Sequence, residues 1–209
     1  PGRDFFERAA RVLQMHPDSL AHRAYVYGFL CHFALDTLSH DYVAEKEAAS
    51  GLSHARIESE LERALMLRDG LDPASHRPTG HLVPSEGNAA VIADFFPEVT
   101  QEQVLDSLRG MVFYLDLLVA PSALKRWVIF TALRLAGQFE KLGGLVVGPD
   151  PEPRCEDSNA ELLRRFDQAA ELAARLIGDF DRVVESGQAE DPIYGRTFDP
   201  KPEQEAANA

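Results

Sequence analysis

The chain has 209 residues, 45% of them hydrophobic, and carries a formal net charge of −13, which is enough apolar material for one packed domain. The acidic balance argues against a nucleic-acid-binding protein, which normally presents a basic face, and against strong attraction to an anionic membrane. The two cysteines predict no disulfide framework, and no run reaches the about 18 to 20 apolar residues that a membrane span needs.

The amino-terminal part of the sequence predicts a first helix and then a longer central one. Residues 1–14 place their apolar side chains on one side of a helix, and the His-Pro-Asp run at 16–18 ends it. The central helix is expected over about residues 19–39. Its sequence is apolar almost all round, which is typical of a helix buried in a core.

Three polar side chains interrupt this apolar helix at steps of four residues: His32, Asp36 and His40. Burying an unpaired carboxylate costs roughly several kcal/mol unless a partner or a metal ion compensates. Residues four apart share a helix face, so His32 and Asp36 can bind one ion. His32 and His40 are about 12 Å apart along the helix axis, whereas ligand bonds to zinc are about 2 Å long. If all three are ligands, there are at least two ions, with Asp36 as the bridge.

A second histidine–carboxylate pair, His54 and Glu58, follows a polar connector predicted over residues 41–51. With His40, this pair would give three protein ligands and one open position, which is the form of a catalytic zinc site. A lone pair of this kind is more often a surface ion pair, and a lone histidine in a core is more often a hydrogen-bonded residue. The combination of two pairs with His40 favours metal binding.

The remaining sequence predicts more helices and no alternating run that requires a sheet. Helices are expected at about residues 53–68, 89–96, 100–119, 121–139 and 158–187, and capping boxes at Thr100/Gln103 and Ser158/Glu161 mark two of their starts. The predicted fold class is all-α, a multi-helix bundle around a buried metal-ligand helix, in one domain over residues 1–187. Residues 188–209 are predicted to form an acidic, disordered tail.

Several other side chains have a simpler prediction. Glu60, Glu62 and Arg63 are expected on a solvated face of the helix that begins near Ser53. Gly28, inside the central helix, either allows a close approach of a neighbouring helix or is merely tolerated. The loop histidines, His76 and His81, are expected to be exposed more often than functional.

The run YVYGFLCHFALDTLSHDYV, followed by GLSHARIESELERALM, resembles the zinc-dependent phospholipase C superfamily, also called the phospholipase C/D domain. The likeness is close over residues 24–70 and loose over most of the chain. It implies an all-helical protein with a cluster of two to three zinc ions. By position, His32 and Asp36 would hold one ion, Asp36 would bridge to another, and His40, His54 and Glu58 would hold a further one. Asp41 departs from several relatives, which have Pro or Gly there.

The resemblance also implies further ligands, and an aspartate serving at the metal-bound water, before the matched segment. The sequence begins at Pro1 without an initiator Met, so we expect a fragment or a processed chain with an incomplete site. His16 and His22 precede the central helix but match no family position. We expect a soluble protein, cytoplasmic or secreted, without a transmembrane segment.

The predicted function is that of a metal-dependent phosphodiester hydrolase, most similar to phospholipase C, in which a multinuclear zinc cluster activates water against a phospholipid or another phosphodiester. Asp36 and Glu58 would set the charge and position of the ions. One alternative is a nuclease of the P1 type, which the acidic charge disfavours. Another is a metal-stabilised binding domain without turnover. A third, an HD-type phosphohydrolase using His40 and Asp41, leaves His54 and Glu58 without a role.

Overall fold

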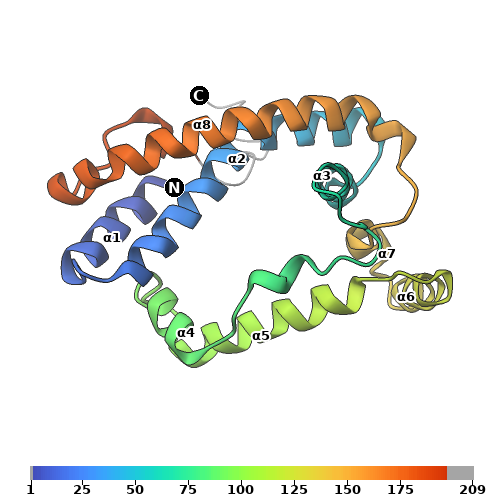
Figure 1. Cartoon of the computed structure of the whole chain (residues 1–209), viewed down its shortest axis with the longest axis horizontal. Coiled ribbons are helices and arrows are strands. Elements are labelled where there is room, and N and C mark those ends of the chain that lie inside the picture. Colours follow the sequence, from blue (N-terminus) through green and yellow to red (C-terminus); the bar gives the residue numbers. More distant parts are fainter. Residues whose placement is uncertain (1, 197–209) are drawn as a thin grey trace. The chain divides into compact units, whose positions relative to one another are not determined.

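The computed structural model describes residues 2–196, which form eight α-helices and no β-strand (Figure 1). The all-α prediction is therefore confirmed over this part of the chain. The α-helices are α1 (Gly2–Met15), α2 (Leu20–Ser50), α3 (His54–Arg68), α4 (Glu86–Ala93), α5 (Gln101–Leu118), α6 (Ala123–Leu135), α7 (Phe139–Leu142) and α8 (Glu156–Ser186). Short 3₁₀ helices lie at η1 (Pro78–His81), η2 (Gly143–Leu145), η3 (Pro153–Cys155) and η4 (Pro192–Gly195).

The chain divides into two compact units, and each is described by itself. Unit 1 contains the residues up to Asp41, then Pro84–Asp106, then those from Arg165 onward. Unit 2 contains Tyr42–Val83 and Ser107–Arg164. Three helices, α2, α5 and α8, contribute residues to both units.

Aromatic side chains form the centre of unit 1. Phe6 of α1 is fully buried, and its ring centroid lies 5.0 Å from Phe33 of α2, 6.1 Å from Phe180 of α8 and 4.8 Å from Tyr194 of η4. Edge and tilted ring contacts of this kind are favourable beyond the area they bury. Figure 1 shows α1 beside the first half of α2. The apolar side of α1 that predicts this helix from the sequence is therefore the side that packs in this core.

The polar connector predicted over residues 41–51 is wrong, because α2 continues through Ser50. The segment is rich in alanine, glutamate and lysine, which are strong helix formers. Tertiary contacts also stabilise it: Val43 is buried, and the Lys46 ammonium lies 2.6 Å from a carboxylate oxygen of Asp157. Gly51, with φ of 67°, ends the helix in a left-handed conformation that glycine adopts easily.

The helix α2 is covered on one side rather than all round. Val26, Leu30 and Phe33 are buried in the core of unit 1, whereas Cys31 and His32 are exposed. The expectation of a metal-ligand helix buried on every side is therefore wrong at the face that carries His32. A Cβ atom at Gly28 would meet nothing within 4 Å, so this glycine serves no close helix approach.

Unit 2 has its own smaller core, made of side chains from α2, the α2–α3 connection, α3, η3 and α8: Val43, Leu52, Ile57, Leu61, Cys155 and Leu162. The 3₁₀ helix η2, directly after α7, packs closely on the first turn of α3. A Cβ atom at Gly144 would lie 2.7 Å from the backbone nitrogen of Arg56. Only glycine fits there, and the start of α3 is held in place by this contact.

Two residues of α3 expected on a solvated face are buried instead. Glu60 is 2% exposed and Arg63 is 8% exposed. The Arg63 guanidinium donates to the carbonyl oxygen of Pro149 at 2.6 Å, and a carboxylate oxygen of Glu60 lies 3.7 Å from the Arg56 guanidinium. Arg63 is compensated by its hydrogen bond, whereas Glu60 Oε2 accepts no hydrogen bond from the described residues. Glu62, the third residue of the predicted face, is exposed.

The two predicted capping boxes have different outcomes. At α5 the box is confirmed, since the Thr100 N–H donates to Gln103 Oε1 at 2.8 Å and the Gln103 N–H donates to Thr100 Oγ1 at 3.2 Å. At α8 it is wrong, because the helix begins at Glu156, two residues before Ser158. The buried Ser158 hydroxyl donates to the carbonyl oxygen of Cys155 instead.

The carboxyl-terminal part of the described chain is structured beyond α8. Within η4, Tyr194 is 2% exposed and belongs to the core of unit 1. The predicted tail thus has a folded beginning up to Arg196, and its residues 197–209 lie outside the described part. Among the described helices none is by itself long and apolar enough to cross a membrane. The pair α5 and α6, bent by 120° relative to each other, reaches that length and apolar composition only when the two helices are taken together.

Candidate metal sites

The first predicted ligand pair, His32 and Asp36, lies on the middle of α2 within unit 1. His32 Nε2 is 3.3 Å from Asp36 Oδ2, and the two side chains are 62% and 20% exposed. Two ligands of one tetrahedral zinc ion are about 3.4 Å apart when each bond is about 2.1 Å. The spacing of the pair therefore suits a shared ion with little rearrangement.

An apolar cavity of about 510 Å³ adjoins this pair. It is lined by three residues of α2 and by six of α8: Cys31, His32, Leu35, Phe166, Ala169, Ala170, Ala173, Ala174 and Ile177. The small alanine side chains of α8 leave the space open. Binding cavities for small ligands usually enclose about 300–1,000 Å³ and are mainly apolar. His32 thus stands at the rim of a space that suits an apolar group.

The second pair, His54 and Glu58, lies in the first two turns of α3, in unit 2. His54 Nε2 is 3.1 Å from Glu58 Oε1. On the other side, His54 Nδ1 is 3.8 Å from Glu47 Oε2, and Glu47 Oε1 accepts the backbone N–H of His54 at 3.1 Å. The imidazole therefore lies between two carboxylates. Carboxylates close to the second ring nitrogen are common beside metal-binding histidines, and no sequence pattern indicates that Glu47 lies there.

A further carboxylate, Glu62, lies one turn after the second pair. The pKa of the Glu62 carboxyl is raised, first by desolvation and then by the charge of Glu58 one turn before it. Glu62 also lines a smaller cavity of about 130 Å³, together with Ser59 and His76. A cation bound beside Glu58 would relieve this repulsion.

His40, the remaining predicted ligand, lies on α2 one turn after Asp36 and is partly buried. It belongs to unit 1, whereas His54 and Glu58 belong to unit 2. The three-ligand combination of His40, His54 and Glu58 therefore stays a prediction.

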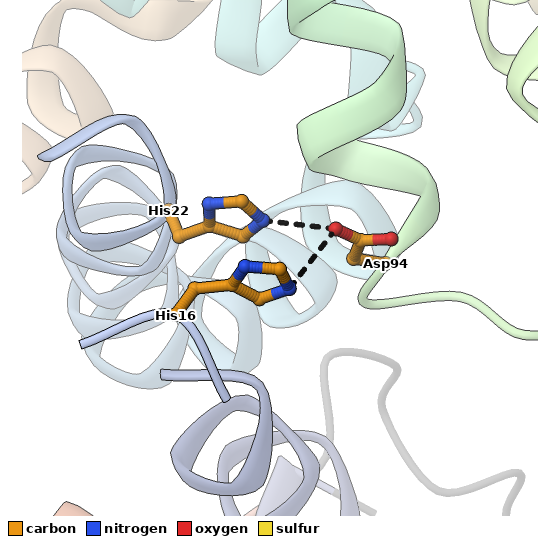
Figure 2. A group of neighbouring side chains, drawn as sticks. All are labelled: His16, His22 and Asp94. Atoms are coloured by element: carbon orange, nitrogen blue, oxygen red, sulfur yellow. Dashed lines mark hydrogen bonds and ion pairs between the residues drawn. The ribbon is translucent and has the colours of Figure 1, made fainter. Parts of the chain in front are cut away.

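A histidine–histidine–aspartate cluster that no sequence pattern indicated lies in unit 1 (Figure 2). His16 follows the end of α1, His22 lies in the first turn of α2, and Asp94 follows the end of α4. His22 Nε2 is 2.9 Å from Asp94 Oδ2, and His16 Nε2 is 3.6 Å from the same oxygen. The two imidazole rings are stacked, with centroids 4.3 Å apart and planes 6° from parallel.

His22 is the fixed member of this cluster. Its side chain is 8% exposed, whereas those of His16 and Asp94 are 42% and 47% exposed. Ser19, just before α2, lies with its hydroxyl 2.6 Å from His22 Nδ1, and it also accepts the backbone N–H of His22 at 3.4 Å. Ser19 thus caps the helix and orients the ring at once.

The sequence does not predict this cluster, because Asp94 is 72 residues away from His22 along the chain. His16 and His22 are six residues apart on either side of a helix break, so they form no i,i+4 step. The only local signal is the pair of histidines beside Ser19, a helix-capping residue.

A scan against protein-family models, a search of curated proteins and a search of solved structures found no match to the chain. The resemblance to zinc-dependent phospholipase C therefore depends on the residues of α2 and α3 alone, and so does every role carried over from it.

Proposed function

We propose that the protein is a metal-dependent phosphodiester hydrolase of the phospholipase C type. The observation that carries this proposal is the position of His32, which lies at ligand spacing from Asp36 and lines the apolar cavity between α2 and α8 of unit 1. A phospholipid has both parts that such a site would bind, a phosphodiester for the metal ions and an apolar chain for the cavity.

The donor set fits zinc. Imidazole nitrogens and carboxylate oxygens are ordinary zinc ligands, and both i,i+4 pairs have the separation that one ion requires. His32 and Asp36 would hold one ion, Asp36 would also serve a neighbouring ion, and His40, His54 and Glu58 would hold a further one. Bound zinc would supply Lewis-acid polarisation of the phosphate and a more acidic water.

The residues of the chain supply orientation, charge and exclusion of water. Asp36 and Glu58 would balance the positive charge of the ions and fix their positions. Glu47 would help to position His54, since it accepts the backbone N–H of His54 at 3.1 Å and adds negative charge 3.8 Å from Nδ1. The alanines of α8 would keep water away from the lipid chain next to His32.

Exposed apolar side chains in unit 2 also support a lipid substrate. Trp127 of α6 is 64% exposed, and Leu124 and Leu135 on the same helix are 71% and 86% exposed. The neighbouring cations are engaged locally, since Lys125 Nζ donates to the carbonyl oxygen of Val119 at 2.6 Å. Such a helix surface favours contact with a lipid interface through apolar side chains.

The test combines metal content with substrate choice. Zinc per chain would be measured by elemental analysis on the wild type, on Asp36→Asn and on His54→Ala, with His81→Ala, at the end of η1, as the control. We expect bound zinc in the wild type, a loss in the first two variants and no change in the control. A folded wild type without zinc affinity would overturn the proposal.

The activity assay would compare a phosphatidylcholine analogue with single-stranded DNA. Hydrolysis of the lipid and not the DNA supports the phospholipase assignment, whereas the reverse result would favour a P1-type nuclease. Zinc binding without turnover of either would favour a binding domain. Asp41→Asn separates the HD-type alternative, because activity of that type would be lost with this carboxylate while a phospholipase would retain it.

A further inference from the structure

We propose that His16, His22 and Asp94 form a second binding site for a divalent transition-metal ion, separate from the ligand pairs of the proposed phosphodiesterase. His22 and His32 are ten residues apart on α2, about 15 Å along the helix axis, so no single ion reaches both. The proposal therefore does not depend on the function proposed above.

The donor atoms already have ligand-like separations. One donor atom from each of His16, His22 and Asp94 lies within 4.8 Å of the other two. The separations of 2.9 Å and 3.6 Å from Asp94 Oδ2 to the two ring nitrogens bracket the about 3.4 Å expected between ligands of one tetrahedral ion. Figure 2 shows both ring nitrogens facing the same carboxylate oxygen.

The exposed members of the cluster can adjust while the buried one stays fixed. The rings of His16 and His22 are parallel, so their lone pairs must turn toward a common point when an ion binds. His16 lies outside α1 and Asp94 follows the end of α4, and their side chains are 42% and 47% exposed, so both have room to turn. His22, held by Ser19, provides the reference position.

The Ser19 hydroxyl contacts the ring nitrogen of His22 that does not face Asp94. A hydroxyl can accept the proton of Nδ1 as readily as it donates to it, so His22 can take the tautomer in which Nε2 has a free lone pair. Partners of this kind typically alter metal affinity 10–100-fold, roughly, when removed. Ser19 is thus a positioning residue for the ion.

The ligand set indicates the class of ion and its role. Two imidazoles and one carboxylate suit zinc, cobalt, nickel, copper or iron rather than calcium or magnesium. The ion would join the end of α1, the start of α2 and the end of α4 within unit 1, so its binding would stabilise the fold of that unit. The partial exposure of His16 and Asp94 leaves room for water as a further ligand.

The test uses Co²⁺ on the full chain after removal of metal with a chelator, in a His32→Ala/His54→Ala background that disables the other pairs. We expect one remaining equivalent of Co²⁺, with visible d–d absorption and a rise in melting temperature. Adding Asp94→Asn or His16→Gln should abolish that equivalent, and adding Ser19→Ala should weaken it at least 10-fold, roughly. Adding His81→Gln should change nothing.

Two outcomes would overturn the proposal. One is a background protein that folds, by its circular dichroism, and binds no Co²⁺. The other is a Co²⁺ equivalent that survives both Asp94→Asn and His16→Gln. Asp94→Asn keeps the size of the side chain and an acceptor for His22, and His16→Gln changes a partly exposed side chain, so the two variants do not depend on one folding outcome. Loss of zinc from the pairs at His32 and His54 would leave this result unaffected.

Discussion

The helix α2 carries two histidine–carboxylate arrangements, ten residues apart, in opposite environments. His22 is buried and takes its carboxylate, Asp94, from another helix end. His32 is 62% exposed and takes its carboxylate, Asp36, from the next turn of the same helix. The first arrangement joins separate segments of unit 1, so it contributes to the fold. The second costs the fold little, so its side chains are available for a ligand.

The largest expected difference between the two is in stability. His22→Ala removes buried packing and the contacts of the imidazole with Ser19 and Asp94, so we expect a loss of about 2–4 kcal/mol in the free energy of unfolding. His32→Ala breaks an exposed ion pair and should change it by less than about 0.5 kcal/mol. Urea unfolding in the presence of a chelator measures both. Equal losses would show that burial does not separate the two arrangements.

The second prediction concerns the buried side of α2 behind His32. Phe33, the next residue, stacks on Tyr194 with ring centroids 6.2 Å apart. Burial raises the pKa of Tyr194 to about 12, whereas an unfolded tyrosine ionises near pH 10, roughly. Between these values the unfolded state binds fewer protons, so stability falls as the pH rises. We expect a loss of about 2–3 kcal/mol from this one group across that window.

Tyr194→Phe sharpens this second prediction, because it removes the ionisable group and keeps the ring. The variant should lose less stability than the wild type between about pH 9 and pH 11, as measured by urea unfolding at each pH. Tyr114→Phe is the matched control, since Tyr114 is 64% exposed. Parallel curves for the wild type and Tyr194→Phe would contradict the assignment.

A third, smaller effect isolates the support of His22. Ser19→Ala removes both a helix cap and the partner of His22 Nδ1, so we expect a loss of about 1–2 kcal/mol. Ser85→Ala removes only a cap, from the Asn88 N–H at the start of α4, and should cost about 1 kcal/mol. Thermal or urea unfolding compares them. If Ser85→Ala costs as much, the contact with His22 contributes nothing.

The smallest expected effect lies between the two arrangements and has the opposite sign. Gly28 has open space at its Cβ position, so Gly28→Ala should stabilise the protein by up to about 1 kcal/mol. Gly144→Ala should instead destabilise it, because the new Cβ would lie 2.7 Å from the Arg56 backbone nitrogen. Melting temperatures of the two variants give the answer. A loss in Gly28→Ala would show that the exposed face of α2 is covered.

The sequence predicts features that depend on local spacing. The all-α class, the α1 stripe, the Thr100 cap and the two i,i+4 pairs follow from helix geometry, and the structure places the atoms of each pair within 3.3 Å. It does not predict features that depend on distant partners. Asp94 reaches His22 from 72 residues away, and Glu60 is buried by the fold of unit 2. Nor does the sequence predict that His32 is exposed, because hydropathy shows how apolar a helix is and not which neighbours cover it.

The contact between Phe6 and Tyr194 has a consequence for synthesis on the ribosome. These rings come from opposite ends of the described chain and share one core, so unit 1 cannot complete its packing until the last helical turn has left the exit tunnel. Unit 2 ends at Arg164 in the sequence, so all of its residues leave the ribosome before η4 and it can fold earlier. Until then the rings of α1 and α2 lack their final cover, and a nascent chain ending near residue 187 would be a natural target for chaperones that bind exposed aromatic side chains.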